Sequence, residues 1–217
     1  ATLNSSAFAK IAGIDNISPN GVLANRRSLY GGYFNGGVGA GQSYAYVGIK
    51  YNATNTGTGG TNYKIIGNGT NSTMIMDKEN KPRVLFSPEA PEILFEDYGT
   101  AELVNGELYV PLDEILKKSF YIVDKHPLKV FIQLEGDCNG VFVTEKSKNG
   151  FKVKELANGT SNTKFSWHIV ANRADDKDAQ GNITSEHVGL RLPYGPVPAK
   201  ETQLAIKSNE KNIVAQK

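Results

Sequence analysis

Two adjacent carboxylates, Glu96 and Asp97, are the first side chains whose types could do chemistry. Glycoside hydrolysis needs two carboxyl groups that face each other across a cleft, roughly 5 to 9 Å apart. Neighbouring residues on a strand point to opposite faces, however, and the segment EILFEDYG is expected to be a strand. The pattern therefore favours two solvated or backbone-bonded carboxylates, and a polysaccharide-cleaving enzyme is kept only as an alternative.

A second acidic segment, DKDAQGNI at 176–183, has the spacing of a calcium loop. Asp176, Asp178 and Gln180 supply oxygen atoms at its first, third and fifth positions, and a glycine follows at the sixth. The bidentate carboxylate that should stand at the twelfth position is missing, because that residue is His187. The segment is therefore predicted to be a polar turn, with calcium binding by these residues as the alternative.

The single cysteine and the three histidines suggest no catalytic centre. Cys138 lies in GDCNG, which is typical of a turn, and no histidine is near it in the sequence, whereas a catalytic thiolate needs a positioned base. One cysteine also excludes an intrachain disulfide and a cysteine-cluster zinc site. Motifs for a serine nucleophile, a phosphate loop or a dinucleotide are absent from the sequence. We expect a protein that is not an enzyme and that uses no cofactor.

Tyrosines in the first part of the chain are interleaved with Gly, Asn, Ser and Thr. Tyrosine combines a large ring with a hydroxyl group and loses little entropy on binding, which suits contact with sugars or proteins. Polar loops at 31–42 and 52–61 are expected to present these rings. The alternative is that they line a seam between chains. The candidate ligand-binding residues are Tyr30, Tyr33, Tyr44, Tyr46, Tyr51 and Tyr63.

The elements that must position these residues are short strands. With 23 glycines in 217 residues, the composition is typical of a turn-rich, all-β protein. Lys and Arg number 24 against 22 acidic residues, which argues against a nucleic-acid partner. No run of about 18 apolar residues is present, so no membrane insertion is expected.

Three zones differ in texture, and we interpret them as domains. Residues 1–90 are a fibre-like β region rich in Gly, Asn and Tyr, in which 43–51 alternates as one half-buried strand with Tyr44 and Tyr46 opposite Val47 and Ile49. Residues 91–174 form a β-meander, either a sandwich, a prism or an intertwined β fold. Residues 175–217 are a polar tail or a docking arm, in which prolines prevent regular pairing.

Local signals in the second zone are clear. Asn105-Gly106 predicts a tight hairpin turn, and 141–146 with 151–156 predicts a second hairpin around Lys148-Asn149-Gly150. PLDEILKKSF at 111–120 has early acids and late lysines, which predicts one short helix of about two turns.

Two patterns in this zone carry a resemblance: DYG at 97–99 followed by NG at 105–106, and GDCNGV-x-V at 136–143. With them, residues 40–193 resemble the closing segment of glycine-rich bacterial surface proteins and phage tail-fibre-like proteins. The resemblance implies a β-rich distal tip, a homotrimer, and a place outside the cell or on a phage-like particle. The Ser-Asp and lysine-rich pattern of self-cleaving fibre ends is not found, so no self-cleavage is expected.

A trimer also has a physical reason. The strands of the first zone are too short to close a core alone, and wrapping three chains about one axis removes sheet edges. The sequence therefore predicts an adhesin, the receptor-binding tip of a homotrimeric fibre, whose partner is a cell-surface glycan or a protein receptor. A structural trimerisation and capping module without a ligand is the first alternative, and a polysaccharide-cleaving enzyme is the second.

Overall fold

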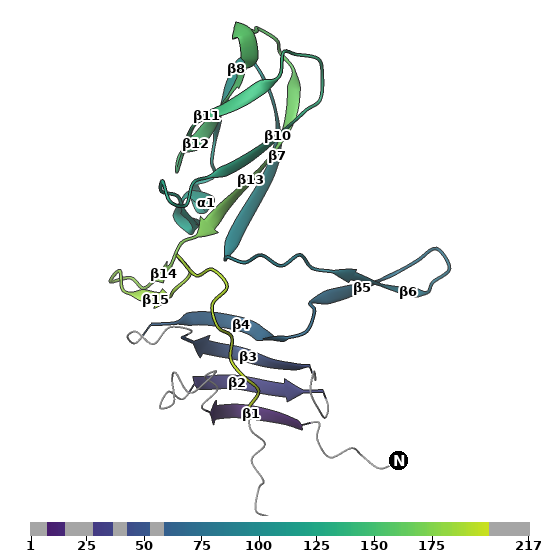
Figure 1. Ribbon diagram of the computed structural model, residues 1–217, viewed down its shortest axis with the longest axis vertical. Helices are drawn as coiled ribbons and strands as arrows, with labels where there is room; N and C mark the ends of the chain where they lie inside the picture. Colours follow the sequence, from purple (N-terminus) through teal and green to yellow (C-terminus); the bar gives the residue numbers. More distant parts are fainter. Residues whose placement is uncertain (1–7, 16–27, 37–42, 53–58, 200–217) are drawn as a thin grey trace, which may run out of the picture.

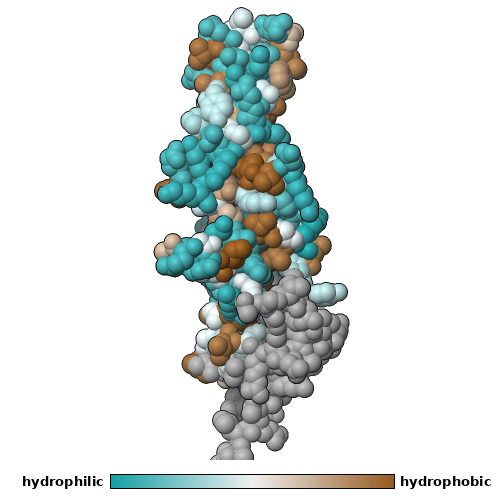
Figure 2. All heavy atoms as spheres, turned by 90° about the vertical axis from the view of Figure 1, so that its left-hand side faces the viewer, coloured by the Kyte–Doolittle hydropathy of each residue, from teal (hydrophilic) through white to brown (hydrophobic). Residues whose placement is uncertain are grey.

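The computed structural model describes residues 8–15, 28–36, 43–52 and 59–199. These residues form several antiparallel sheets and one short helix, so the expected all-β class is confirmed. The molecule is elongated, with a four-stranded sheet at one end, a sandwich at the other, and a hairpin that projects sideways between them (Figure 1). The same elongated outline is seen from the side in Figure 2, where apolar residues interrupt a largely hydrophilic surface.

The first sheet is a meander in the order β1-β2-β3-β4. Its strands are β1 (Phe8–Asp15), β2 (Ser28–Asn35), β3 (Tyr44–Tyr51) and β4 (Thr61–Asn68). Strand β2 pairs with β3 on both sides of Gly31 and Gly48, but these two opposed residues do not pair. Gly48 has a φ of +62°, which glycine adopts without steric cost. At Gly31 and Gly48 the alternation of side chains is interrupted, so residues on the two sides of this point that should lie on opposite faces of the sheet lie on the same face. We call this interruption the change of face.

This change of face corrects one expectation. Strict alternation through 43–51 would put Ile49 on the face opposite Tyr46. Instead Tyr46, Ile49 and Tyr51 are all buried on one face, while Val47 is exposed on the other. Tyr30 and Tyr33 of β2 lie on the buried face in the same way, on either side of Gly31. The sheet therefore collects its tyrosines on a single face, which we call the tyrosine face.

Residues 194–199, which we call the strap, cover the tyrosine face. The strap crosses the strands of the first sheet near the end of the described chain (Figure 1). Its prolines lack an N–H and cannot extend the sheet, so its carbonyl groups need other donors. Val197 and the buried Ala199 pack against the tyrosine cluster. The part of the predicted tail that is described thus docks on the chain's own first sheet.

Strands β5 (Ser72–Met76) and β6 (Pro82–Phe86) form a two-stranded hairpin, which we call the arm. Both of its strands are exposed along their whole length. At its tip, Asp77 accepts hydrogen bonds from the N–H groups of Glu79 and Lys81 and from the Arg83 guanidinium, and Asn80 adopts a φ of +60°. The turn is well formed, although the strands bury almost nothing.

The sandwich consists of two sheets, β10-β13-β7 and β11-β12-β8, with β9 added beside β13. Its strands are β7 (Leu94–Glu102), β8 (Glu107–Pro111), β9 (Phe120–Tyr121), β10 (Lys129–Leu134), β11 (Val141–Ser147), β12 (Gly150–Glu155) and β13 (Lys164–Arg173). Phe151 from one sheet and Phe165 and Ile169 from the other are completely buried in a common core. Among the three expected architectures, this region is a sandwich.

The hairpin at 141–156 and the short helix are confirmed. Strand β11 pairs with β12 as expected. Helix α1 (Glu114–Ser119) begins after Asp113, whose carboxylate accepts the Ile115 N–H at 2.7 Å.

Asn105 and Gly106 both have positive φ, as a tight turn requires, but the turn does not join two strands of one sheet. The expected tight turn is present, because Val104 and Glu107 on either side of it exchange two backbone hydrogen bonds. Beyond this pair the chain parts into two sheets, since β7 pairs with β13 and β8 pairs with β12.

Glu155 is a buried carboxylate, only 4% exposed, at the end of β12. It accepts the N–H groups of Asn139 at 3.0 Å and Ser161 at 2.8 Å. These backbone hydrogen bonds hold the pKa of Glu155 below its usual value. The Glu155 carboxylate therefore holds together the loops that contain Asn139 and Ser161, at one end of the sandwich.

A small hairpin of β14 (Asp176–Lys177) and β15 (Ile183–Ser185) connects the sandwich to the first sheet. The Glu186 N–H donates to the Gly60 carbonyl at 3.0 Å, and Ser185 Oγ accepts the Asn62 N–H at 2.9 Å. These bonds satisfy part of the free edge of β4, which would otherwise be open to pairing with another chain.

Candidate functional site

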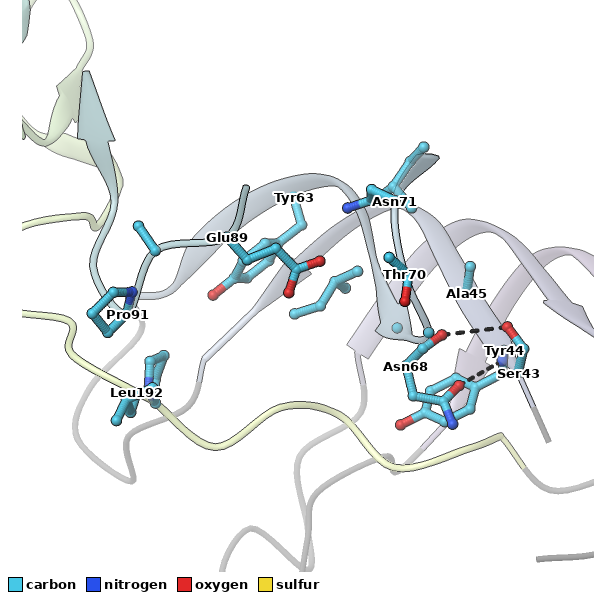
Figure 3. Close-up of a pocket in the computed structure, with 16 residues that line it drawn as sticks. Ser43, Tyr44, Ala45, Tyr63, Asn68, Thr70, Asn71, Glu89, Pro91 and Leu192 are labelled. Carbon is cyan, nitrogen blue, oxygen red and sulfur yellow. Dashed lines mark hydrogen bonds between the residues drawn. The ribbon is translucent and has the colours of Figure 1, made fainter. Parts of the chain in front are cut away.

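A pocket of about 670 Å³ lies where β3 begins and β4 ends, between the residues next to the arm and the segment that leads to the strap. Figure 3 shows its lining: Tyr63 and Glu89 lie beside each other, Pro91 and Leu192 form one end, and Asn68, Thr70 and Tyr44 form the other. Small-ligand pockets have volumes of roughly 300 to 1,000 Å³, so its size suits one or two sugar rings.

The floor of the pocket is held by hydrogen bonds that the sheet itself makes. Asn68 Oδ1 accepts the Tyr44 N–H at 2.7 Å, and the Asn68 carbonyl accepts the Ser43 hydroxyl at 3.3 Å (Figure 3). Because Asn68 is the last residue of β4, these bonds close the end of the β3–β4 pair. The floor of the pocket therefore lies on the sheet, while residues 69–71, 89–91 and 192–193 of the connecting segments form its walls.

Three polar side chains on its walls are available to a ligand. Within the described part of the chain, Thr70, Asn71 and Glu89 are exposed and their side chains make no hydrogen bond. Tyr63 adds a half-buried ring, and burial raises the pKa of its hydroxyl above 10.0, so this hydroxyl stays protonated. An aromatic ring beside an amide, a hydroxyl and a carboxylate is a set of groups that can stack on a sugar and bind its hydroxyls.

The predicted tyrosines separate into two groups. Tyr30, Tyr33, Tyr46 and Tyr51 are buried on strands, which corrects the expectation that polar loops present them at the surface. Tyr44 and Tyr63 are half-buried and line the pocket, so for these two ligand binding stays a prediction. Residues 37–42 and 53–58, the central parts of the two expected contact loops, lie outside the described residues.

The buried tyrosines bind the strap. The hydroxyl groups of three β3 tyrosines donate to three successive strap carbonyls: Tyr51 to Gly195 at 3.3 Å, Tyr44 to Pro196 at 2.6 Å, and Tyr46 to Val197 at 2.8 Å. The tyrosines do line a seam, as the alternative interpretation held, but this seam lies within one chain. The sequence signal that could have revealed it is the proline-rich segment itself, since extended proline-rich segments dock on aromatic surfaces.

The acidic segment at 176–182 is a polar turn. Asp178 Oδ1 accepts the N–H groups of Gln180 and Asn182, and these bonds and the Asn182 amide hold the pKa of Asp178 below its usual value. Asp176 instead pairs with Arg173 at 2.9 Å and with His187 at 3.3 Å. In the described residues, no three His, Cys, Asp or Glu side chains gather to hold a metal ion. Asp176 and Asp178 thus bond to protein groups in this turn, and calcium binding by these two residues with Gln180 stays a prediction.

The structure adds an aromatic column that the sequence did not reveal. Phe131, His168 and Tyr98 are directly opposed on β10, β13 and β7, and the His168 ring stacks on Tyr98 with centroids 4.5 Å apart. Glu96 accepts the Tyr98 hydroxyl and lies 3.1 Å from His168 Nε2, and these contacts keep the pKa of Glu96 below its usual value. Glu96 is thus bound within the column, as expected for a structural carboxylate.

Glu92 is another acidic residue close to Glu96 in the sequence. It links the segment that follows β15 to the sandwich. It accepts the Asn172 amide and the Arg191 guanidinium, both at 2.7 Å, and these bonds lower its pKa. Glu92 also lines a smaller pocket of about 480 Å³, together with the basic residues Lys125, Lys129 and Arg191. Among the described residues that line this pocket, Glu92 is the only carboxylate, and its charge is balanced by Arg191.

Comparisons of the chain with protein-family models, with curated proteins and with solved structures found no match. Within the described ranges, no helix has the length and apolar character that crossing a membrane requires. The functional conclusion therefore depends on the geometry of the site.

Proposed function

We propose that the chain is the receptor-binding tip of a homotrimeric fibre outside the cell and that it binds surface glycans in the pocket beside Tyr63. The observation that carries this proposal is the set of unpaired polar side chains, Thr70, Asn71 and Glu89, around an aromatic ring in this pocket. Three such sites on one frame gain avidity without new contacts, so weak binding at each site is sufficient.

Binding is favoured over cleavage because the pocket supplies a single carboxylate. Glu89 is the only acidic residue among the described residues that line it. Hydrolysis of a glycosidic bond needs a second carboxyl group across the cleft, as acid, base or nucleophile. A role in recognition, in which Glu89 accepts hydrogen bonds from sugar hydroxyls, needs no such partner.

A glycan array tests the proposal when it is followed by affinity measurements on pocket variants. Asn71→Ala removes a carboxamide, and Glu89→Gln replaces a charged acceptor oxygen with a neutral NH2 donor, so each should weaken binding to a glycan hit about fivefold to tenfold. Gln133→Ala and Glu102→Gln are matched controls, because they change exposed residues of the same types on the sandwich. Equal affinity of pocket variants and controls would contradict the site.

The second candidate is a structural trimerisation and capping module that binds no ligand. The observation that favours it is the use of Tyr44, Tyr46 and Tyr51 to fasten the strap, since this is a role in assembly of the fold. Sedimentation and the array together separate the two: a trimer that binds nothing would support the module, and a monomer at micromolar concentration would contradict both.

A further inference from the structure

The arm has a strongly apolar face that no described residue of its own chain covers. Residues directly opposite each other in the hairpin share a face, which places Met74 with Val84, Met76 with Pro82, and Phe86 beside them. Met74 and Phe86 are both 70% exposed and Met76 is 65% exposed. The arm projects away from the sheet and from the sandwich (Figure 1). An isolated two-stranded hairpin is marginal in water, so this one needs a partner surface.

The described residues also leave an apolar face of the first sheet exposed, on the side opposite the tyrosines. Ile11, Gly32, Val47 and Ile65 form one row that runs across all four strands. Ile11 is 77% exposed and Ile65 is 63% exposed, while the ring of Phe34 lies over Gly32 and fills the gap in the row. We call this surface the open face. Monomeric proteins rarely leave such a continuous apolar surface in water.

We infer that the arm of one copy packs on the open face of the next copy, so that the chains assemble by a directional exchange of arms. The inference rests on the proposed homotrimer and does not require the proposed ligand, and the two sites share one residue, Ile65 of the open face, which also lines the pocket beside Tyr63. Each copy would give one arm and receive one, which is a head-to-tail contact that closes into a ring when the rotation permits.

The two surfaces match in size and in chemistry. A five-residue strand is about 17 Å long, and four strands at about 4.8 Å spacing span about 14 Å. With roughly 150 to 200 Å² for a fully exposed apolar side chain, each surface offers on the order of 400 to 500 Å² of apolar area. One contact then buries about 900 Å², which is less than the roughly 1,200 to 2,000 Å² of a standard specific interface. A single contact is therefore weak, and ring closure, in which each copy makes two contacts, has to supply the rest of the stability.

The identity of the exposed residues also favours a protein partner. Both methionines of the chain, Met74 and Met76, lie on this face of the arm. Methionine adapts its shape to a partner and is enriched at interfaces. Every copy of the chain carries both an arm and an open face, so a second copy always supplies the surface that the arm needs. Folding back on the same sheet is disfavoured because only residues 69–71 connect β4 to β5.

Oligomeric state tests the inference with the full chain. Met74→Asp with Phe86→Asp should convert the oligomer to a monomer in sedimentation at micromolar concentration, and Ile65→Asp should do the same from the other side. Thr73→Asp, on the opposite face of the arm, and Val104→Asp, an exposed apolar position on the sandwich, are the matched controls and should leave the oligomer intact. An oligomer that survives both surface changes would overturn arm exchange while leaving the proposed function standing.

Mixing decides the direction of the contact. The arm variant keeps an intact open face and the Ile65→Asp variant keeps an intact arm, so a mixture should give a one-to-one complex that neither forms alone. A mixture that stays monomeric would contradict an arm-to-face contact.

Cross-linking decides whether the contact lies between copies. In a Cys138→Ser background, Ile65→Cys with Phe86→Cys should give disulfide-linked dimers and trimers on a non-reducing gel. A disulfide formed only within single chains would overturn the inference, because the arm would then cover its own sheet. Failure of any disulfide to form, with wild-type assembly intact, would equally overturn it.

Discussion

In the sandwich, Phe151 and Phe165 are covered by the facing sheet, whereas in the first sheet Tyr33 and Tyr46 are covered by a strap of six residues. The sandwich core is apolar and needs no directional contact, because two sheets already exclude water from it. The strap is too short to bury much by itself, and it is fixed by tyrosine hydroxyl groups that donate to its carbonyls. The sandwich core is thus stabilised by buried apolar area, whereas the first sheet is covered by a strap that tyrosine hydrogen bonds hold in place.

The two regions also differ in what they leave open. The outer face of the β10-β13-β7 sheet carries polar side chains around its aromatic column, as a solvated face should. The open face of the first sheet is apolar instead. The first sheet, which keeps an exposed apolar face, is therefore the region where we expect assembly. The sandwich, whose outer face is polar, needs no partner to cover it.

The largest effect is expected from removing the strap. A chain that ends after Pro193 loses every carbonyl that the β3 tyrosines bind, and it exposes their rings to water. Hydrogen exchange of β1–β4 should become fast, while the sandwich keeps its protection. A chain that ends after Ala199 is the control and should behave like the full chain. Protection of β1–β4 in both truncated chains would show that the strap is dispensable.

Truncating a side chain in the sandwich core should instead destabilise the sandwich and not the first sheet. Phe151→Ala removes a completely buried ring that lies edge-on to Trp167, and it should lower the free energy of unfolding of the sandwich by about 3 to 5 kcal/mol. Urea denaturation measures this loss. Phe142→Ala, at a ring on β11 that is largely exposed, should cost about 1 kcal/mol or less. Equal costs at the two positions would contradict the assigned core.

A smaller effect is expected at the line where the first sheet changes face. Gly48→Ala meets no atom closer than 4.0 Å, so its cost comes from the positive φ alone, about 1 to 2 kcal/mol. Gly48→Asn is the control, because asparagine adopts this conformation more readily and should recover part of the loss. Thermal unfolding of the first sheet, followed by tyrosine fluorescence, would detect the difference. No loss in the alanine variant would contradict the change of face.

The smallest effect concerns the hydroxyl group of Tyr51. Tyr51→Phe removes one hydrogen bond to the strap and should cost about 1 kcal/mol or less at pH 7. Burial, followed by the neighbouring Tyr63 and Tyr44, raises the pKa of Tyr51 from 10.0 to about 12. Because the folded pKa lies above the unfolded one, this contribution is complete below pH 10 and is lost as the pH rises through about 12.

The first sheet should therefore open in alkali before the sandwich does, and Tyr51→Phe should reduce that difference. Near-ultraviolet absorbance follows the tyrosinate, and hydrogen exchange follows the strands. Loss of both regions at the same pH would contradict a hydroxyl-fastened strap.

Features encoded within a few residues could be predicted from the sequence. The turn at Asn105-Gly106 needs positive φ angles that these residues tolerate, and α1 begins where Asp113 can cap it. The pairing of β8 with β12 could not be predicted, because a turn signal says that the chain bends but not which strand it then meets. In the candidate site, Tyr44 and Tyr63 could be chosen by residue type. Glu89 could not, because only the tertiary structure shows that the segment after β6 lies beside these tyrosines.

The sequence alone determined the all-β class, the positions of most strands and the gathering of tyrosines in the first zone, because alternation and turn residues act over short stretches of chain. Only the tertiary structure decided that these tyrosines hold the strap, since the contacting residues are more than 140 positions apart and share no local signal. It also decided which apolar residues remain in water. Burial depends on what the rest of the chain can reach, and among the described residues the strap covers the tyrosine face whereas the arm and the open face remain exposed.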